Sequence, residues 1–174
     1  MSALVFLFLA LRAAHVLMAG IWVGSTVFMS GLLMPAIEAS GPSGGQVMMR
    51  MDRGGIATYM AVLGGATVLT GLYLLWHFTG GFDPAVAASH AGMAFGTGGA
   101  AGILAGVIGA SVVGRSAKKV ASLMHGAVGM TDGPVKGALM QQASALGRRA
   151  KSGSRVGIML QVIALVLMAV GHYV

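Results

Sequence analysis

The chain has 174 residues, of which 56% are hydrophobic and 9% are charged; it has no cysteine and a net charge of +7. The lack of cysteine excludes disulfides, thiolate metal sites and thiol nucleophiles, so any metal ligand must be His, Met or an oxygen atom. The apolar content lies far above that of soluble domains and predicts an integral membrane protein, whose basic residues meet lipid headgroups and not nucleic acid.

Four apolar stretches follow one another along the chain, at residues 4–34, 56–78, 89–113 and 156–173. Each can cross a hydrocarbon core of about 30 Å at about 1.5 Å per residue, and backbone hydrogen bonding in lipid requires helices. The first has no basic residue before Arg12 and is too long for a signal peptide, so we expect it to be retained. The sequence therefore predicts one all-α domain over 1–174, an up-down-up-down bundle of four transmembrane helices.

Proline and glycine mark the expected helix ends. Pro35 is expected to end the first helix, because proline lacks the amide hydrogen that a helix interior needs. Gly114 is expected to close the third helix. A tight turn between the second and third helices is predicted at residues 80–84, where two glycines precede Asp83-Pro84.

The basic residues are distributed unevenly among the connections. Ten of the eleven lie in the first and third connections: Arg50, Arg53, Arg115, Lys118, Lys119, Lys136, Arg148, Arg149, Lys151 and Arg155. The positive-inside rule then predicts that both termini lie outside the cytoplasm, which in a bacterial inner membrane means the periplasm. Arg12 is the exception, because it lies inside the first apolar stretch.

The third connection, residues 114–155, is too long and too patterned for a simple turn. Apolar residues recur at helical spacing over 120–128 and again over 135–146. This spacing favours two short amphipathic helices on the inner leaflet, with an ordinary basic linker as the alternative.

The third apolar stretch carries a strip of small residues at four-residue intervals. These are Gly98, Gly102, Gly106, Ala110 and Gly114, preceded by Gly92 and Gly96. Such a strip is typical of close helix packing or of dimerisation, and so makes a homo-oligomer a candidate assembly. A second interpretation is that the glycines leave room for a flat macrocycle.

Four of the five histidines are candidate metal ligands, because ionisable residues inside a membrane are costly and mark function. They are His15, His77, His90 and His172, one for each apolar stretch. At about 1.5 Å per residue they lie about 24 to 35 Å from the cytoplasmic edge, all in the outer half. The fifth, His125, lies in the basic connection and is expected to be solvated.

His15 is the strongest candidate because it lies well inside its helix. Arg12 lies one turn away on the same face, and Trp22 lies two turns away in the other direction. A neutral, metal-ligating imidazole avoids repulsion with the guanidinium, and haem propionates would give Arg12 an anionic partner. The alternative is a histidine that hydrogen-bonds to a neighbouring helix while Arg12 extends to the interface.

The string LRAAHVLMAGIWVG, from Leu11 to Gly24, resembles the first helix of the copper-resistance D family. Its relatives include the membrane protoporphyrinogen oxidases, which bind haem b. The shared features are His15, the Trp-Val-Gly that begins at Trp22, and a proline after the helix. The string TGLYLLW in the second stretch also resembles this family, but more weakly. The resemblance implies that His15 is a haem or copper ligand; the third stretch lacks the lysine that the oxidases usually carry.

Three functions follow as hypotheses. The first is a membrane cytochrome with haem b bound by His15 and a second histidine at similar depth, either His15 with His172 or His77 with His90. It would exchange electrons with quinone or a periplasmic redox protein, or act as an oxidase. The second is copper binding or transport, favoured by fourteen methionines, which also fill apolar interfaces. The third is a non-catalytic subunit of a larger membrane complex.

Overall fold

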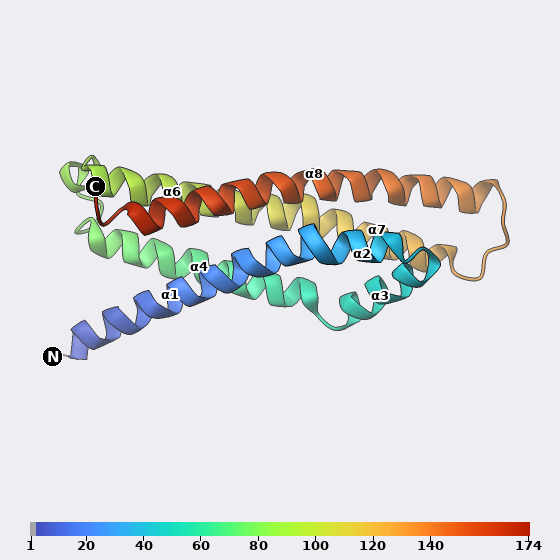
Figure 1. Cartoon of the computed structure of the whole chain (residues 1–174), viewed down its shortest axis with the longest axis horizontal. Coiled ribbons are helices and arrows are strands. Elements are labelled where there is room, and N and C mark those ends of the chain that lie inside the picture. The colour runs from blue at the N-terminus through green and yellow to red at the C-terminus, as the bar shows by residue number, and fades with distance from the viewer. Residues whose placement is uncertain (1–2) are drawn as a thin grey trace.

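The protein is described by a computed structural model that covers residues 3–174. Over these residues the fold is all-helical and contains no strand. Four helical segments are long and apolar enough to cross a membrane: Ala3–Ala39, Ile56–Phe78, His90–Ala127 and Pro134–Val170. They lie side by side as an elongated bundle (Figure 1), so the prediction of an all-α chain with four long apolar helices is confirmed.

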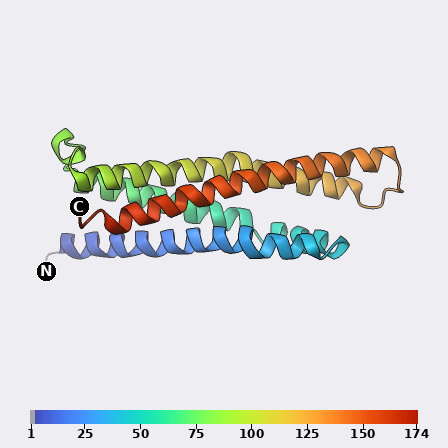
Figure 2. The same cartoon turned by 45° about the horizontal axis from the view of Figure 1, so that its top comes forward.

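Both chain termini lie at the same end of the bundle in the two views (Figures 1 and 2). The turn between the second and third segments lies at this end as well, and we call it the termini end. The opposite end, which we call the connection end, holds the first and third connections. All basic residues except Arg12 lie in α3, in α7 or in the part of α8 that ends at Arg155, and none lies in the turn at the termini end.

The first segment does not stop at Pro35. It consists of α1 (Ala3–Phe28), a π-helical turn η1 (Met29–Leu33) and α2 (Met34–Ala39). In the π turn the amide of Met34 bonds to the carbonyl of Met29, five residues back instead of four. Pro35 then lies in the first turn of α2, where a missing amide hydrogen costs nothing, so the helix continues.

The first connection contains a helix that the sequence did not reveal, α3 (Pro42–Arg53). The second segment, α4 (Ile56–Phe78), has the predicted bounds. It begins after Gly55, whose φ of 76° is accessible to glycine at little cost. The residues beyond Phe78 form the predicted turn, in which φ is positive at Gly80 and Gly81.

A buried threonine holds this turn together. The hydroxyl of Thr79 donates to the carbonyl of Leu75 at 2.9 Å and accepts from the amide of Phe82 at 3.0 Å. The short helix α5 (Pro84–Ala87) follows, capped by Asp83, which accepts from the amide of Ala85 at 2.8 Å. The third segment therefore starts close to the end of the second.

The third and fourth segments are longer than predicted. Gly114 does not end the third, which runs as α6 (His90–Ile108), η2 (Gly109–Gly114) and α7 (Arg115–Ala127). The fourth is one helix, α8 (Pro134–Val170). The two expected amphipathic stretches are therefore helical, but they extend the membrane helices and are not separate short helices. The only interruption of the helices in this region lies at residues 128–133, between α7 and α8.

The glycine strip packs in part against the same chain. The helices α6 and α8 lie together along their length (Figure 1). Ala101 and Ala105 are buried, and a Cβ at Gly98 would lie 3.3 Å from the carbonyl oxygen of Ala164 on α8. The strip therefore packs closely against α8 at Gly98. It does not do so at Gly102, where a Cβ would meet no atom within 4 Å.

Polar contacts join α1 and its extension to α8 from one end of the bundle to the other. They are Arg12 with His172, Thr26 with Gln161, Ser30 with Ser154, and Glu38 with Lys151. Because such contacts are directional, they fix the antiparallel register of the first and last helices.

Candidate functional site

The candidate site is centred on His15, where α1 faces α4. The Nδ1 atom of His15 lies 3.0 Å from the hydroxyl oxygen of Thr70. A Cβ at Gly71 would lie only 2.8 Å from Cε1 of the imidazole, so Gly71 leaves the space in which the ring sits. His15 is half-buried between the two helices as a result.

The contact with Thr70 determines which ring nitrogen of His15 carries the proton. The hydroxyl of Thr70 is directed at the helix carbonyls of Ala66, at 2.7 Å, and Thr67, at 3.0 Å. It has a single hydrogen to donate, so its oxygen accepts from His15. With its proton on Nδ1, a neutral imidazole keeps its lone pair on Nε2. A neutral imidazole in this form is a ready metal ligand.

Arg12, one turn from His15 toward the termini end, donates a hydrogen bond to Nε2 of His172. It has no carboxylate partner: within residues 3–174 the ion pairs are Lys136 with Asp132 and Lys151 with Glu38. The guanidinium thus lies near the end of an apolar bundle with a neutral acceptor only. An anionic group would be a stronger partner for it.

His172 follows the last turn of α8 and contacts an aromatic pair. Its ring lies 5.0 Å from the ring of Phe95, edge to face, and Phe95 in turn lies 5.0 Å from Phe78. These contacts set the imidazole beside Arg12, one helical turn from the level of His15. The structure therefore brings His15, Arg12 and His172 into one region, although the two imidazoles do not contact each other.

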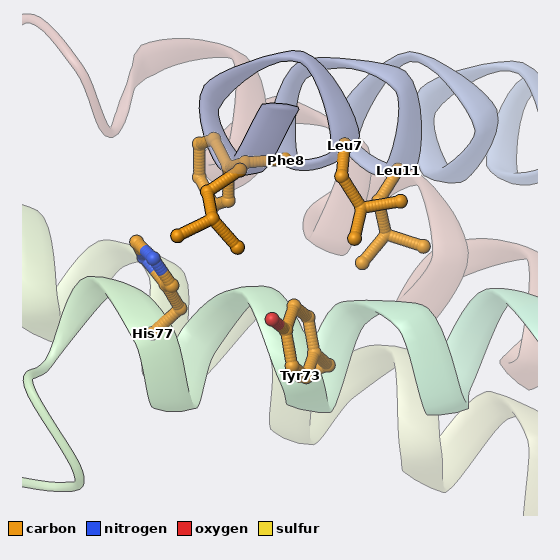
Figure 3. A pocket seen from close by; sticks show the side chains of 6 residues that line it. Leu7, Phe8, Leu11, Tyr73 and His77 are labelled. Carbon is orange, nitrogen blue, oxygen red and sulfur yellow. The ribbon is translucent and has the colours of Figure 1, made fainter. Parts of the chain in front are cut away.

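His77 belongs to a different place, a cavity between α1 and α4 at the termini end. The cavity has a volume of about 420 Å³ and is lined by Leu4, Leu7, Phe8, Leu11, Tyr73 and His77. Figure 3 shows His77 and Tyr73 on α4 pointing toward Phe8 and the leucines of α1. The rings of His77 and Phe8 lie 4.5 Å apart at an interplanar angle of 31°.

The other two histidines lie on the surface. His90 is the exposed first residue of α6, and His125 is exposed on α7. The expected pair of His77 and His90 makes no direct contact among the described residues. Across residues 3–174 there is also no group of three or more histidine or acidic side chains that could hold a metal ion.

Trp22 lies in the packed core of the bundle. Its side chain is 8% exposed, and a Cβ at Gly64 of α4 would lie 2.9 Å from its Cε2 atom. The other edge of the indole faces Gly106 of α6, where a Cβ would lie 3.7 Å from it. Trp22 therefore packs three helices together two turns below His15.

Sequence reasoning missed the residues of α4 that surround the site. Thr70, Gly71 and Tyr73 all belong to TGLYLLW, the string with the weaker family resemblance, but no spacing in the sequence pairs them with His15. The pairing follows from the antiparallel register of α1 and α4, which sets residue 15 opposite residues 70 and 71.

The chain matches no protein-family model, no curated protein and no solved structure in the three comparisons.

Proposed function

We propose that this protein is a small membrane cytochrome that holds haem b through His15 and transfers electrons. The observation that carries the proposal is the hydrogen bond from Nδ1 of His15 to Thr70, because it leaves Nε2 as a free ligand atom inside an apolar bundle. A histidine that binds haem typically donates a hydrogen bond from the N–H group of its second ring nitrogen to a fixed acceptor. When bound, haem supplies reversible one-electron transfer at its iron.

The residues around His15 fit such a group in their chemistry. Gly71 leaves space at the ring, and Arg12 offers a guanidinium without a carboxylate partner, suited to a propionate. We propose His172 as the second residue that would hold the haem, because Arg12 already holds its imidazole one turn from His15. An Arg12 that turns to a propionate would free the Nε2 lone pair of His172 for the metal.

The arrangement of donors favours haem over copper. A copper ion bound by imidazoles needs several of them around one point, and the histidines of the described residues form no group of three with one another or with acidic side chains. A haem iron takes its equatorial ligands from the macrocycle and needs only one or two from the protein. Copper handling is therefore the second candidate.

We further propose that the termini end faces the periplasm of a bacterium and the connection end its cytoplasm. The support is the positive-inside rule, since all basic residues except Arg12 lie in α3, in α7 or in α8 up to Arg155, and none lies in the turn at the termini end. The site around His15 would then lie in the outer half of the inner membrane, within reach of a quinone pool or a periplasmic redox protein.

An absorption spectrum of the purified protein, first oxidised and then reduced, tests this function. We expect a Soret band that shifts on reduction in the native chain and is lost in His15→Ala, with the variant still present in the membrane. His125→Ala is the matched control, because that histidine is exposed on α7, and its spectrum should be native. A His15→Ala protein with full haem content would contradict the proposal; copper found by metal analysis without a Soret band would favour the second candidate.

A further inference from the structure

The cavity between α1 and α4 lies beside the proposed haem site but does not include it. Leu11 of its lining is one turn from His15 on α1, and Tyr73 is one turn from Thr70 on α4. At about 1.5 Å per residue, the cavity therefore begins about 5 Å from the contact of His15 with Thr70, toward the termini end. We call it the α1–α4 cavity.

The α1–α4 cavity opens toward the lipid. Leu4 is 79% exposed and Leu7 is 62% exposed, and both lie on the outer surface of the bundle. In a membrane this surface meets acyl chains and not water. A ligand of this cavity must therefore be soluble in lipid and approach from the side.

Two polar side chains in the cavity have no hydrogen-bond partner among the described residues. Within residues 3–174 no hydrogen bond is present for the hydroxyl of Tyr73 or for the imidazole of His77, although both line the cavity (Figure 3). A saturated acyl chain would give these two exposed side chains no hydrogen bond, so that only water at the end of the bundle could satisfy them. An occupant with oxygen atoms on an apolar body would satisfy them.

The walls of the cavity favour a flat ring. The ring centroids of Phe8 and His77 lie 4.5 Å apart with the rings tilted by 31°, and the ring centroid of Tyr73 lies 6.4 Å from that of His77. Aromatic side chains at such spacing stack readily on another planar ring. The volume of about 420 Å³ also lies in the range of small-molecule sites.

We propose that the α1–α4 cavity binds the ring of a lipid-soluble quinone or quinol, with Tyr73 and His77 hydrogen-bonding to its ring oxygens. The role of this ligand as electron partner rests on the proposed haem function, whereas its binding does not. A quinol that becomes a quinone releases two electrons and two protons, which requires two one-electron transfers. His77 can accept one proton, and water at the nearby interface can accept the other.

A second cavity on the same helix pair provides an internal comparison. It has a volume of about 290 Å³, lies nearer the connection end and is lined by Met18, Thr58, Tyr59, Val62, Leu63 and Ala66. It contains a tyrosine but no histidine and no second aromatic ring. Substitutions there change the same two helices without changing the proposed quinone site.

The test uses the full chain in phosphatidylcholine vesicles, titrated with a decyl-substituted benzoquinone while tryptophan fluorescence is recorded. Trp76 reports on the cavity because its ring lies 6.0 Å from that of Tyr73. Quinone that is merely dissolved in the bilayer quenches in proportion to its concentration, whereas a bound ring gives quenching that saturates. Decylbenzene, which has the ring and the tail but no oxygen, serves as competitor.

We expect saturable quenching in the native chain, weakened about three- to tenfold by Tyr73→Phe and again by His77→Leu. Tyr59→Phe in the second cavity should leave it unchanged, and decylbenzene should compete poorly. Linear quenching in the native chain, saturation retained after both substitutions, or equal competition by decylbenzene would each overturn the proposal, the last by showing an apolar groove only.

The same variants separate this inference from the haem proposal. His15→Ala should lose the Soret band and keep saturable quenching, whereas Tyr73→Phe with His77→Leu should keep the Soret band and lose saturation. A native chain that binds quinone without haem would refute the proposed function alone. A native chain with haem and only linear quenching would refute the quinone site alone.

Discussion

Arg12 and His172, which are 160 residues apart in the chain, form a hydrogen bond that joins the first helix to the end of the last. The guanidinium donates and Nε2 of the imidazole accepts, so His172 is neutral and its ligand atom is covered. An arginine that contacts only a neutral group is costly to keep in lipid, by at least about 2.5 kcal/mol at the centre of a bilayer. The bond therefore marks a place where an anion would be favoured.

The substitution Arg12→Leu tests whether that anion is a haem propionate. The helix becomes more apolar, yet we expect haem to be retained less well because the propionate loses its partner. Loss of a positive charge near the iron also stabilises the ferric state, so the midpoint potential should fall. A redox titration of the purified variant measures both effects.

Arg115→Leu is the matched control, because this arginine is exposed at the start of α7, at the connection end. It should leave haem content and potential at their native values. An Arg12→Leu protein that behaves like the control would show that Arg12 only extends toward the interface.

Thr70→Val tests the acceptor that orients His15. Valine has the shape of threonine but cannot accept the proton of Nδ1, so the imidazole is free to rotate or to change its tautomer. We expect haem affinity to fall by about 10- to 100-fold, as is typical for the loss of a hydrogen bond behind a metal ligand. Haem titration into the stripped protein gives the affinity.

Two further variants distinguish this role from packing. Thr70→Ser keeps the hydroxyl and should restore native affinity. Thr67→Val removes a neighbouring buried hydroxyl that bonds to the carbonyl of Leu63 and not to His15, and it should have little effect. Equal losses in Thr67→Val and Thr70→Val would point to packing and not to the hydrogen bond.

The sequence was sufficient to predict the number of long apolar helices, because each apolar stretch exceeds the thickness of a bilayer. The bounds of Ile56–Phe78 also followed, since glycines lie close to both ends. The first and third segments run on past Pro35 and Gly114, with one π-helical turn before Pro35 and another that ends at Gly114. Hydropathy carries no information on such a change of hydrogen-bond register.

The candidate site was predictable on α1 and at His172, but not on α4. His15 and Arg12 are recognisable because ionisable residues are rare in an apolar stretch. Their partners are not, because α4 is apolar around its whole circumference and its sequence does not indicate which face meets α1. The contact of His15 with Thr70 and Gly71 emerges only once the helices are packed in register.

Reporter fusions test the proposed orientation. A reporter placed after Val174 should be active only in the periplasm, and one inserted near Gly129, in the connection between α7 and α8, should be active only in the cytoplasm. The reason is the concentration of basic residues around the second position. The reverse pattern would place His15 in the inner half of the membrane and contradict access from the periplasm.

The packing of Trp22 against α4 gives a stability prediction that does not depend on any cofactor. At Gly64 an added Cβ would lie 2.9 Å from Cε2 and 3.0 Å from Cζ2 of the indole, which is rigid and enclosed by a third helix. Gly64→Ala should therefore destabilise the bundle by about 1 to 3 kcal/mol, the usual cost of overpacking. At the adjacent Gly65 a Cβ would meet no atom within 4 Å, so Gly65→Ala should leave stability unchanged or raise it slightly. Unfolding in increasing dodecyl sulfate, followed by circular dichroism, compares the two variants. Similar unfolding midpoints for both would mean that Trp22 of α1 does not pack closely against α4.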